Sequence, residues 1–362
     1  MTAQLTWPLV FGELADTSQP LKPETVSWAM EDILGERATD AHVTAFILGL
    51  KLRGETPEHV AALASVMLDH AQLVPQDHGH SVILDIVGTG GDGSHSVNIS
   101  TMSAIVAAAC GIPVIKHGNR AVSSATGAAD VLEELGVVID LDPVQVARVA
   151  RDAGIAFCFA PRHHPATRFA VPARKLLGIP TVFNILGPLT NPAGANAGLI
   201  GCANLDLAPI MARVLQERGV SALVVRGTDG LDEISLSHPT QVWDATGVTV
   251  TEELLQPAEF GVVDFSSEDL RGGERDRNAE LLIKVLGGQT SGDDEAKIAA
   301  IRMSVAVNAA AALVAASSAA GEATQGTLAE RINSFIPQCM DAIDGGSAWA
   351  LLQKWIATSH EV

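Results

Sequence analysis

A glycine-rich segment near residue 90 has the composition of an anion-binding loop. It follows the apolar run 82–87, which is typical of a buried strand, and contains glycines at positions 88, 90, 91 and 93. Glycine lets the backbone take positive φ and expose successive N–H groups. Asn98, Ser100 and Thr101 are suited to cap a following helix, whose N-terminus would stabilise a phosphate. Asp92 would repel a phosphate unless a metal ion or a sugar hydroxyl lies between them. The alternative interpretation of the glycine-rich segment is a tight turn that binds no ligand.

A second segment of the same kind follows the short apolar run 113–116. It reads KHGNRAVSS, so that Lys116 and Arg120 bring two fixed positive charges to the end of a strand. Ser123, Ser124 and Thr126 precede a helix and form a second hydroxyl-rich helix N-terminus. Lys116 could alternatively be a strand-end lysine in water. Two such segments in tandem indicate a ligand with two phosphate groups, and neither fits the dinucleotide-binding or P-loop motif.

An acidic pair, Asp232 and Glu233, follows another predicted strand and the turn GTDG. Carboxylates are hard oxygen ligands, and Mg²⁺ prefers a few of them together with substrate phosphates. A solvated acidic turn is the other interpretation of two adjacent acids.

The elements around these motifs predict an α/β protein. Residues 1–76 have helical periodicity throughout, with an apolar stripe at 26–34, a second helix from Thr39 and a third from Thr56. Strands and helices then alternate, which predicts a mainly parallel sheet flanked by helices. The predicted strands are 82–87, 113–116, 137–140, 155–159, 199–203 and 222–225. Ligands bind such sheets beyond the carboxyl ends of the strands, where both loops and the acidic pair fall.

The remaining segments predict three further features. Five prolines interrupt 162–192, which indicates a crossover that faces the substrate. A hairpin is predicted from 233–237 and 241–244, and the alanine-rich run 298–316 predicts a tightly packed helix.

Composition and charge argue against several classes of protein. The chain has 362 residues, 47% of them hydrophobic, and a formal net charge of −19, which disfavours a nucleic-acid partner. We find no signal peptide and expect no charge-free apolar run of about 18 residues, so no membrane partner is predicted. Four widely spread cysteines, at 110, 158, 202 and 339, are interpreted as reduced core residues. These features predict a cytoplasmic protein.

The motifs together resemble the anthranilate phosphoribosyltransferase family. GTGGDG, NIST and KHGNRAVSS are followed by HHPATRFAVPARKLLGIPTVFNILGPLTNP and GLDEIS, so that the resemblance covers roughly 21–314. It implies transfer of the 5-phosphoribosyl group from 5-phosphoribosyl 1-diphosphate (PRPP) to the amine of anthranilate in tryptophan biosynthesis, with two Mg²⁺ ions. Such a reaction needs no protein nucleophile, because neutralising the leaving diphosphate and positioning the acceptor supply most of the rate.

The resemblance also assigns the site residues. For PRPP it implies Gly88, Gly91, Asp92, Ser96, Asn98, Ile99, Ser100, Thr101, Lys116, His117, Gly118, Asn119, Arg120, Ala121, Val122, Ser123, Ser124 and Ala128. For the metal it implies Ser100, Asp232 and Glu233, and for anthranilate Gly88, Asn119, His164 and Arg174. Arg174 would bind the anthranilate carboxylate, since a guanidinium fork suits that group. Without the resemblance, Arg174 could equally lie on a solvated helix face, and Ser100 could be a helix cap.

His117 is the candidate for a role in proton transfer, although a single histidine is more often a structural group. The chain departs from the family pattern at Ser96, Val97, Ala125 and Thr126. Ala125 stands where the family often has lysine, so these departures put substrate affinity in doubt.

The resemblance implies two lobes and a homodimer. The helical lobe is predicted at 1–76, with a returning segment at about 165–193, and the PRPP-binding α/β lobe at 77–164 and 194–362. The active site would lie between the lobes, and two chains would pair through the helical lobe. Two alternatives are a pyrimidine-nucleoside phosphorylase and a non-catalytic relative that binds nucleic acid. The first would not need KHGNR, the acidic pair and Arg174 together, and the second predicts a basic surface.

Overall fold

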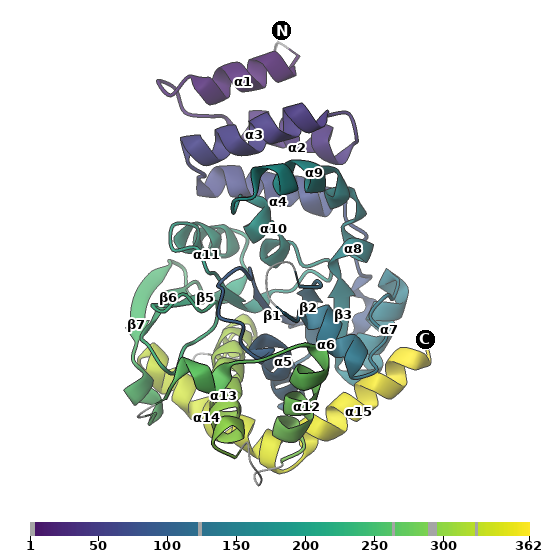
Figure 1. The fold of residues 1–362 in the computed structure, drawn as a ribbon, viewed down its shortest axis with the longest axis vertical. Coiled ribbons are helices and arrows are strands. Elements are labelled where there is room, and N and C mark those ends of the chain that lie inside the picture. Colours follow the sequence, from purple (N-terminus) through teal and green to yellow (C-terminus); the bar gives the residue numbers. More distant parts are fainter. Residues whose placement is uncertain (1–3, 122–124, 263–264, 289–294, 323–324) are drawn as a thin grey trace.

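The computed structural model describes residues 4–121, 125–262, 265–288, 295–322 and 325–362. Its N-terminal part is a helical bundle at one end of the molecule (Figure 1). Thr39 and Thr56 cap two of the helices through their side chains, as the sequence predicts. The bundle consists of α1 (Trp7–Ala15), α2 (Pro23–Leu34), α3 (Asp40–Arg53) and α4 (Pro57–Asp69).

The middle of the molecule is a seven-stranded sheet in the order β3-β2-β1-β4-β5-β6-β7. The five strands from β3 to β5 are parallel, and β6 and β7 add to the edge antiparallel. The prediction of a mainly parallel sheet is therefore confirmed. The strands are β1 (Leu84–Gly88), β2 (Val114–Gly118), β3 (Ile155–Phe159), β4 (Ala197–Gly201), β5 (Ser221–Gly227), β6 (Thr240–Asp244) and β7 (Thr251–Leu255).

Two strand predictions are wrong. Residues 137–140 form no strand. Val138 N instead donates to Ser359 Oγ at 3.0 Å, so a C-terminal helix satisfies this backbone. Residues 233–237 form no hairpin arm, because side chains hold that backbone: Ile234 N donates to Asn308 Oδ1 at 2.9 Å and Ser235 N to Thr240 Oγ1 at 2.9 Å.

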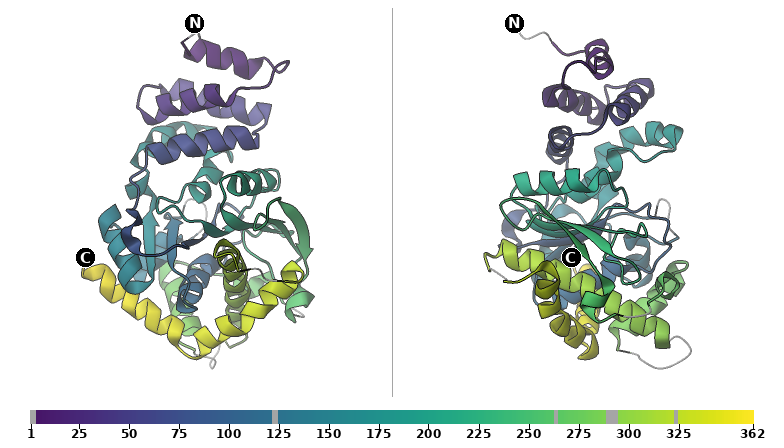
Figure 2. Two further views of the ribbon diagram at one scale, coloured as in Figure 1. Left: turned by 180° about the vertical axis from the view of Figure 1, so that it is seen from behind. Right: turned by 90° about the vertical axis from the view of Figure 1, so that its left-hand side faces the viewer.

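Helices cover both faces of the sheet (Figures 1 and 2). Successive strand residues point to opposite faces, and neighbours such as Ile86 and Val87, or Leu199 and Ile200, accordingly belong to different core clusters. One face packs against α10 (Phe183–Leu189), α11 (Ala208–Glu217) and the bundle. The other packs against α5 (Ile99–Ala109), α6 (Ala128–Glu134), α7 (Pro143–Ala153), α12 (Arg275–Leu286), α13 (Glu295–Ala319), α14 (Leu328–Asp344) and α15 (Ser347–His360).

The segment 160–189 leaves the sheet and returns to the bundle. It forms short helices because its prolines interrupt regular structure: α8 (Ala160–His163), η2 (Pro165–Ala170), α9 (Val171–Leu177) and α10. Ala170, Ala173 and Val182 are buried in the same core cluster as the bundle helices. The exact lobe boundaries stay a prediction. Three more short 3₁₀ helices are η1 (Gln76–His78), η3 (Pro257–Phe260) and η4 (Ser267–Leu270).

The longest helix, α13, corrects one expectation from the sequence. Residues 303–321 carry no charge, and by length and composition α13 could cross a membrane. However, 78% of its most apolar window is buried inside the protein, so core packing accounts for its hydropathy. Cys110, Cys158, Cys202 and Cys339 are free, as expected. The cytoplasmic location stays a prediction.

Candidate functional site

The glycine loop begins where β1 ends, at the carboxyl edge of the sheet. Gly90, Gly91 and Gly93 have φ of 64°, 79° and 71°, the left-handed region that glycine adopts without strain. Gly90 N donates to Asp232 Oδ2 at 2.7 Å, which joins this loop to the acidic pair. A Cβ at Gly88 would lie 2.2 Å from the same oxygen. Glycine at position 88 is therefore required for Asp232 to approach the loop.

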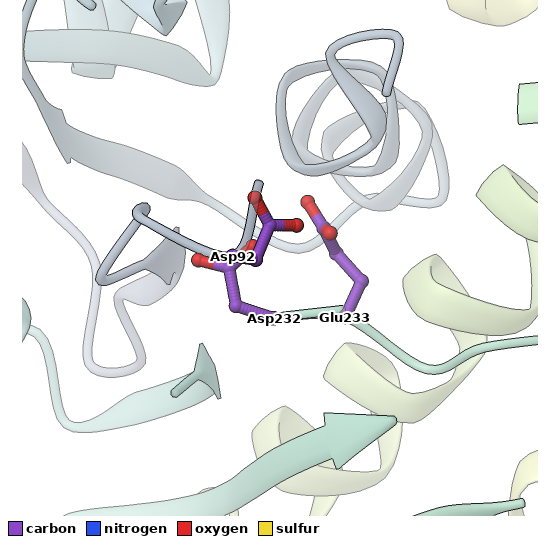
Figure 3. A group of neighbouring side chains, drawn as sticks. All are labelled: Asp92, Asp232 and Glu233. Atoms are coloured by element: carbon purple, nitrogen blue, oxygen red, sulfur yellow. The ribbon is translucent and has the colours of Figure 1, made fainter. Parts of the chain in front are cut away.

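Three carboxylates gather at this point: Asp92 from the glycine loop, and Asp232 and Glu233 from the turn after β5 (Figure 3). One oxygen from each lies within 4.8 Å of the others. Burial raises the pKa of Asp232 and of Glu233, and repulsion between the carboxylates raises both further. We call Asp92, Asp232 and Glu233 the acid cluster.

The acid cluster fits a magnesium ion. Its donors are hard oxygens, and Glu233 Oε2 is buried without a hydrogen-bond partner among the described residues. Ser100 lines the same small cavity of about 10 Å³ as Asp232 and Glu233. The structure thus brings together all three predicted metal residues and adds Asp92. Like charges so close together repel each other, and a cation bound between them would offset that repulsion.

Lys116 lies behind this cavity and not in water. Only 2% of the residue is exposed. Its Nζ donates to Ser100 Oγ at 3.4 Å and to Ile86 O. Burial lowers the pKa of Lys116, while Asp85 and the acidic pair oppose that shift. The strand-end lysine in water is therefore excluded, and the ammonium group lies within hydrogen-bond distance of Ser100.

The N-terminus of α5 faces the site with its backbone. Asn98 holds the N-cap position, but its side chain makes no cap, contrary to expectation. Its Nδ2 donates to Thr126 O at 3.1 Å, and its Oδ1 accepts from Asn278 Nδ2 at 3.0 Å. The first N–H groups of a helix have no intrahelical acceptor. In α5, Ile99 N donates to Val97 O at 2.7 Å, which leaves those of Ser100 and Thr101 for an anion. Ile99 and Thr101 are buried, and Thr101 Oγ1 has no hydrogen-bond partner among the described residues. Ser96 pairs with Arg271 as a β-bridge.

The second loop differs from the prediction. The Arg120 guanidinium is paired with Asp130 at 3.1 Å and with Glu133, which raise its pKa. Asp130 Oδ2 also accepts from Ala121 N and Gly127 N at 2.9 Å each. A carboxylate of the chain itself therefore occupies these donors before α6, where a phosphate was expected. Val122, Ser123 and Ser124 lie outside the described residues.

His117 and His164 are buried neighbours, with ring centroids 5.2 Å apart. His117 Nδ1 donates to Gly187 O and His164 Nε2 to Thr190 O, both at 2.9 Å, since a carbonyl oxygen can only accept. Their other ring nitrogens, which therefore lack a proton, are buried without a partner in the described chain. Burial lowers the pKa of His117 to about 3 and that of His164 to about 4. Both rings are neutral hydrogen-bond acceptors.

Arg174, on α9, is partly buried and its guanidinium lies 5.9 Å from the ring centroid of Phe183. Burial lowers its pKa. Within the described residues no hydrogen bond or ion pair engages this guanidinium, and none joins it to the two loops. Asn119, the other predicted anthranilate residue, is exposed beside Gly118, and its Oδ1 accepts from Arg120 N at 2.8 Å. Ala128 is the first residue of α6 and packs near Gly118.

Sequence reasoning missed three residues that support the site. Asn308 holds both backbone groups of Ile234, next to the acidic pair, through Oδ1 at 2.9 Å and Nδ2 at 3.2 Å. Asp85 and Asn191 bond to each other at 2.8 Å below the two loops. A single polar residue within an apolar run, as at positions 85 and 308, was the available signal.

The comparisons with known proteins agree with this geometry. Residues 11–71 match the family model "Glycosyl transferase family, helical bundle domain", and residues 80–338 match "Glycosyl transferase family, a/b domain". The chain is 48% identical over 350 residues to the anthranilate phosphoribosyltransferase of Rhodococcus opacus, covering 97% of this chain and 92% of that protein.

Solved structures give the same result. The crystal structure of anthranilate phosphoribosyltransferase from Thermus thermophilus superimposes with a TM-score of 0.84 at 34% identity, covering 98% of this chain and 99% of that one. The Saccharomyces cerevisiae enzyme in complex with PRPP and Mg has a TM-score of 0.84 at 28% identity, with 98% of each chain covered. The same yeast enzyme in complex with 4-fluoroanthranilate has a TM-score of 0.83 at 27% identity, with 99% of each chain covered. The chain therefore belongs to the anthranilate phosphoribosyltransferase family.

Proposed function

We propose that this chain transfers the 5-phosphoribosyl group of PRPP to the amine of anthranilate, which yields N-(5-phosphoribosyl)anthranilate and diphosphate in tryptophan biosynthesis. The observation that carries the proposal is the acid cluster, which lies beside the glycine loop at the carboxyl ends of β1 and β5. A diphosphate and a magnesium ion need these two features side by side. The PRPP and Mg in the yeast relative agree with this ligand pair.

Magnesium bound at Asp232, Glu233 and Ser100 would neutralise the charge that develops on the leaving diphosphate. We infer two ions, because three carboxylates and a diphosphate carry more negative charge than one divalent ion can compensate. Asp92 then serves PRPP binding through the metal, which resolves the repulsion that its charge would otherwise cause. Lys116 adds a positive charge beneath Ser100.

Backbone donors bind the rest of PRPP in this proposal. The N–H groups of the glycine loop at Gly88 and Gly91, and those of Ser100 and Thr101 at the N-terminus of α5, are suited to phosphate oxygens. Arg120 keeps its assigned role on the strength of the family resemblance, because its guanidinium pairs with Asp130 and Glu133 and its N donates to Asn119 Oδ1. The remaining assigned residues of the second loop, from His117 to Ser124 and Ala128, keep their proposed roles on the strength of the family resemblance.

The anthranilate site needs a cation for the carboxylate and acceptors for the amine. Arg174 is a partly buried cation without an anionic partner in the described chain, and His117 Nε2 is an unpartnered acceptor. With a pKa of about 3, His117 acts by orienting the amine and accepting its hydrogen bond, not as a strong base. His164, Asn119 and Gly88 complete this site.

Anthranilate fluorescence measured against time tests the proposal. With PRPP and Mg²⁺ we expect a steady loss of fluorescence, and no loss when PRPP is omitted or the metal is chelated. Stable fluorescence in the complete mixture, with a homologous enzyme active in parallel, would contradict the proposal. Phosphorolysis of pyrimidine nucleosides and DNA binding, measured on the same preparation, would then decide between the alternatives.

We also propose that two chains pair through the helical lobe. Large apolar side chains are exposed on its helices, including Leu52 of α3 at 79% and Leu176 of α9 at 77%, and α3 packs against α9. Sedimentation equilibrium should give twice the chain mass of 37.6 kDa, and Leu52→Asp with Leu176→Asp should give the monomer mass. Val248→Asp, at an apolar residue 91% exposed outside the lobe, is the control. A monomeric wild type would contradict the pairing.

A further inference from the structure

β1 and β2 part from each other after a single paired position. They pair only at Leu84 and Val114, although both strands are fully described. In contrast, β1 pairs with β4 over five positions, and β2 pairs with β3 over five. The sheet is therefore split between the two strands that lead into the glycine loop and the second loop.

The split leaves backbone groups that need other partners. Leu84 N donates to Pro113 O at 3.0 Å. In a regular parallel ladder the next bonds would run from Ile86 N to Ile115 O and from His117 N to Ile86 O. A buried backbone group without a partner is costly, so side chains must supply these bonds.

Two side chains from distant segments bond to the backbone groups of β2 that the missing ladder leaves free. Asp85 Oδ1 accepts from His117 N at 3.1 Å, and Asp85 Oδ2 accepts from Asn191 Nδ2 at 2.8 Å. The same Asn191 nitrogen donates to Ile115 O at 2.8 Å. A carboxylate and an amide thus stand where the ladder between the strands would be.

Lys116 satisfies the carbonyl on the β1 side by donating to Ile86 O. A backbone hydrogen bond from Ile86 also acts on the Asp85 carboxylate. We name Asp85, Lys116 and Asn191 the wedge. All three are buried. Together they bond to the backbone N–H and C=O groups that the missing ladder leaves without a partner.

Two of the three wedge residues border a cavity. A cavity of about 400 Å³ is lined by Asp85, Asn191 and mostly apolar residues such as Leu189 and Ile200. Burying a carboxylate and an ammonium group is unfavourable unless both are well paired. A continuous backbone ladder would be the simpler way to join these strands, so the wedge requires an explanation beyond stability.

We propose that the wedge sets the separation of the glycine loop from the second loop, and that Asp85 is a positioning residue for the PRPP site. Paired strands lie about 4.8 Å apart, and the inserted side chains hold β1 and β2 farther apart just before Gly88 and Gly118. This makes room for one ligand that contacts both loops. Lys116 also reaches Ser100, so the wedge touches the site directly. The inference rests on the proposed function, in which PRPP is that ligand.

Asp85→Asn tests this role with almost unchanged shape. The groups bonded to the carboxylate, His117 N and Asn191 Nδ2, are both donors, so an asparagine must turn one N–H toward another donor. We expect the KM for PRPP to rise at least about tenfold, with the KM for anthranilate within about threefold of wild type. Asn191→Ala should give the same pattern, because it removes the donor to Asp85 and to Ile115 O.

Asn196→Ala is the matched control. Asn196 also bridges backbone groups near β1, since Oδ1 accepts from Ile83 N and Nδ2 donates to Ser81 O at 2.9 Å each, but it lies at the end of the strand away from the loops. This variant should lower the melting temperature and leave both KM values unchanged. Asn191→Asp should also raise the KM for PRPP, because it removes the donor to Ile115 O and sets a second carboxylate against Asp85.

Calorimetric titration with PRPP and Mg²⁺ separates the two proposals. If wild type binds PRPP but does not consume anthranilate, only the proposed function is contradicted, and the Kd for PRPP replaces KM in the comparison of variants. If Asp85→Asn and Asn191→Ala fold and keep wild-type affinity for PRPP, the wedge proposal is overturned. A wild type that does not bind PRPP would overturn both.

Discussion

Asp232→Asn is expected to reduce kcat/KM by about 10³-fold. Asp232 belongs to the acid cluster and its Oδ2 also anchors the glycine loop at Gly90. Charge stabilisation by a metal ion contributes several kcal/mol, and about 4 kcal/mol corresponds to a 10³-fold change in rate. Initial rates of fluorescence loss at varied PRPP and Mg²⁺ give the measurement.

Thermal melting provides a second test of Asp232→Asn, in which the metal-free variant is expected to be more stable than wild type although it is less active. Without metal, Asp232→Asn removes one of three carboxylates that repel each other, so the metal-free variant should melt at a higher temperature than wild type. The rise in melting temperature that Mg²⁺ and PRPP cause in wild type should disappear in the variant. Asp229→Asn is the control, because Asp229 lies in the same turn, accepts from Ser235 Oγ at 2.9 Å and is outside the acid cluster. An equal loss of activity in Asp229→Asn would contradict a specific metal role.

Arg174→Ala is expected to raise the KM for anthranilate by about 10²-fold and to change kcat little. A hydrogen bond between charged groups contributes about 1.5–3 kcal/mol, and contacts made equally to the substrate and to the transition state affect KM alone. Arg174→Lys should recover only part of the loss, since an ammonium group cannot form the paired bonds of a guanidinium.

Substrate analogues make the Arg174 test specific. Aniline lacks the carboxylate, so wild type and Arg174→Ala should use it equally poorly. Arg168→Ala is the matched control, because Arg168 lies in the same crossover segment, stacks 4.4 Å from the ring centroid of Phe169 and donates to Pro165 O. If Arg174→Ala affects anthranilate and aniline alike, Arg174 does not bind the carboxylate.

The sequence predicts those parts of the fold that local patterns determine. Asp142 followed by Pro143 predicts the start of α7 because capping acts within one helical turn. The five parallel strands follow from short apolar runs. Residues 137–140 have the same pattern and form no strand, because a helix more than 200 residues later satisfies their backbone. Partners so distant leave no local signal.

The candidate site likewise contains residues that the sequence predicts and residues that it does not. Glycine at 88, the acidic pair and Ser100 are recognisable because their types and order are distinctive. The occupied guanidinium of Arg120 and the wedge are not, since each depends on contacts between separate segments. Asp85 meets Asn191 106 positions along the chain, and Asn308 meets Ile234 74 positions away. Such pairs depend on the distances between strands in the folded sheet, which the local sequence does not specify.

The alanine-rich core of α13 has a consequence for engineering the enzyme. Ala309, Ala310, Ala311 and Ala312 are fully buried, and α13 packs against α5 as well as holding Ile234 through Asn308. A larger side chain in such a tightly filled place shifts backbone at a cost of about 1–3 kcal/mol. The shift would reach Ser100 through α5 and the acidic pair through Asn308. Libraries that seek new acceptor specificity should therefore leave this helix constant and place their diversity in the crossover segment.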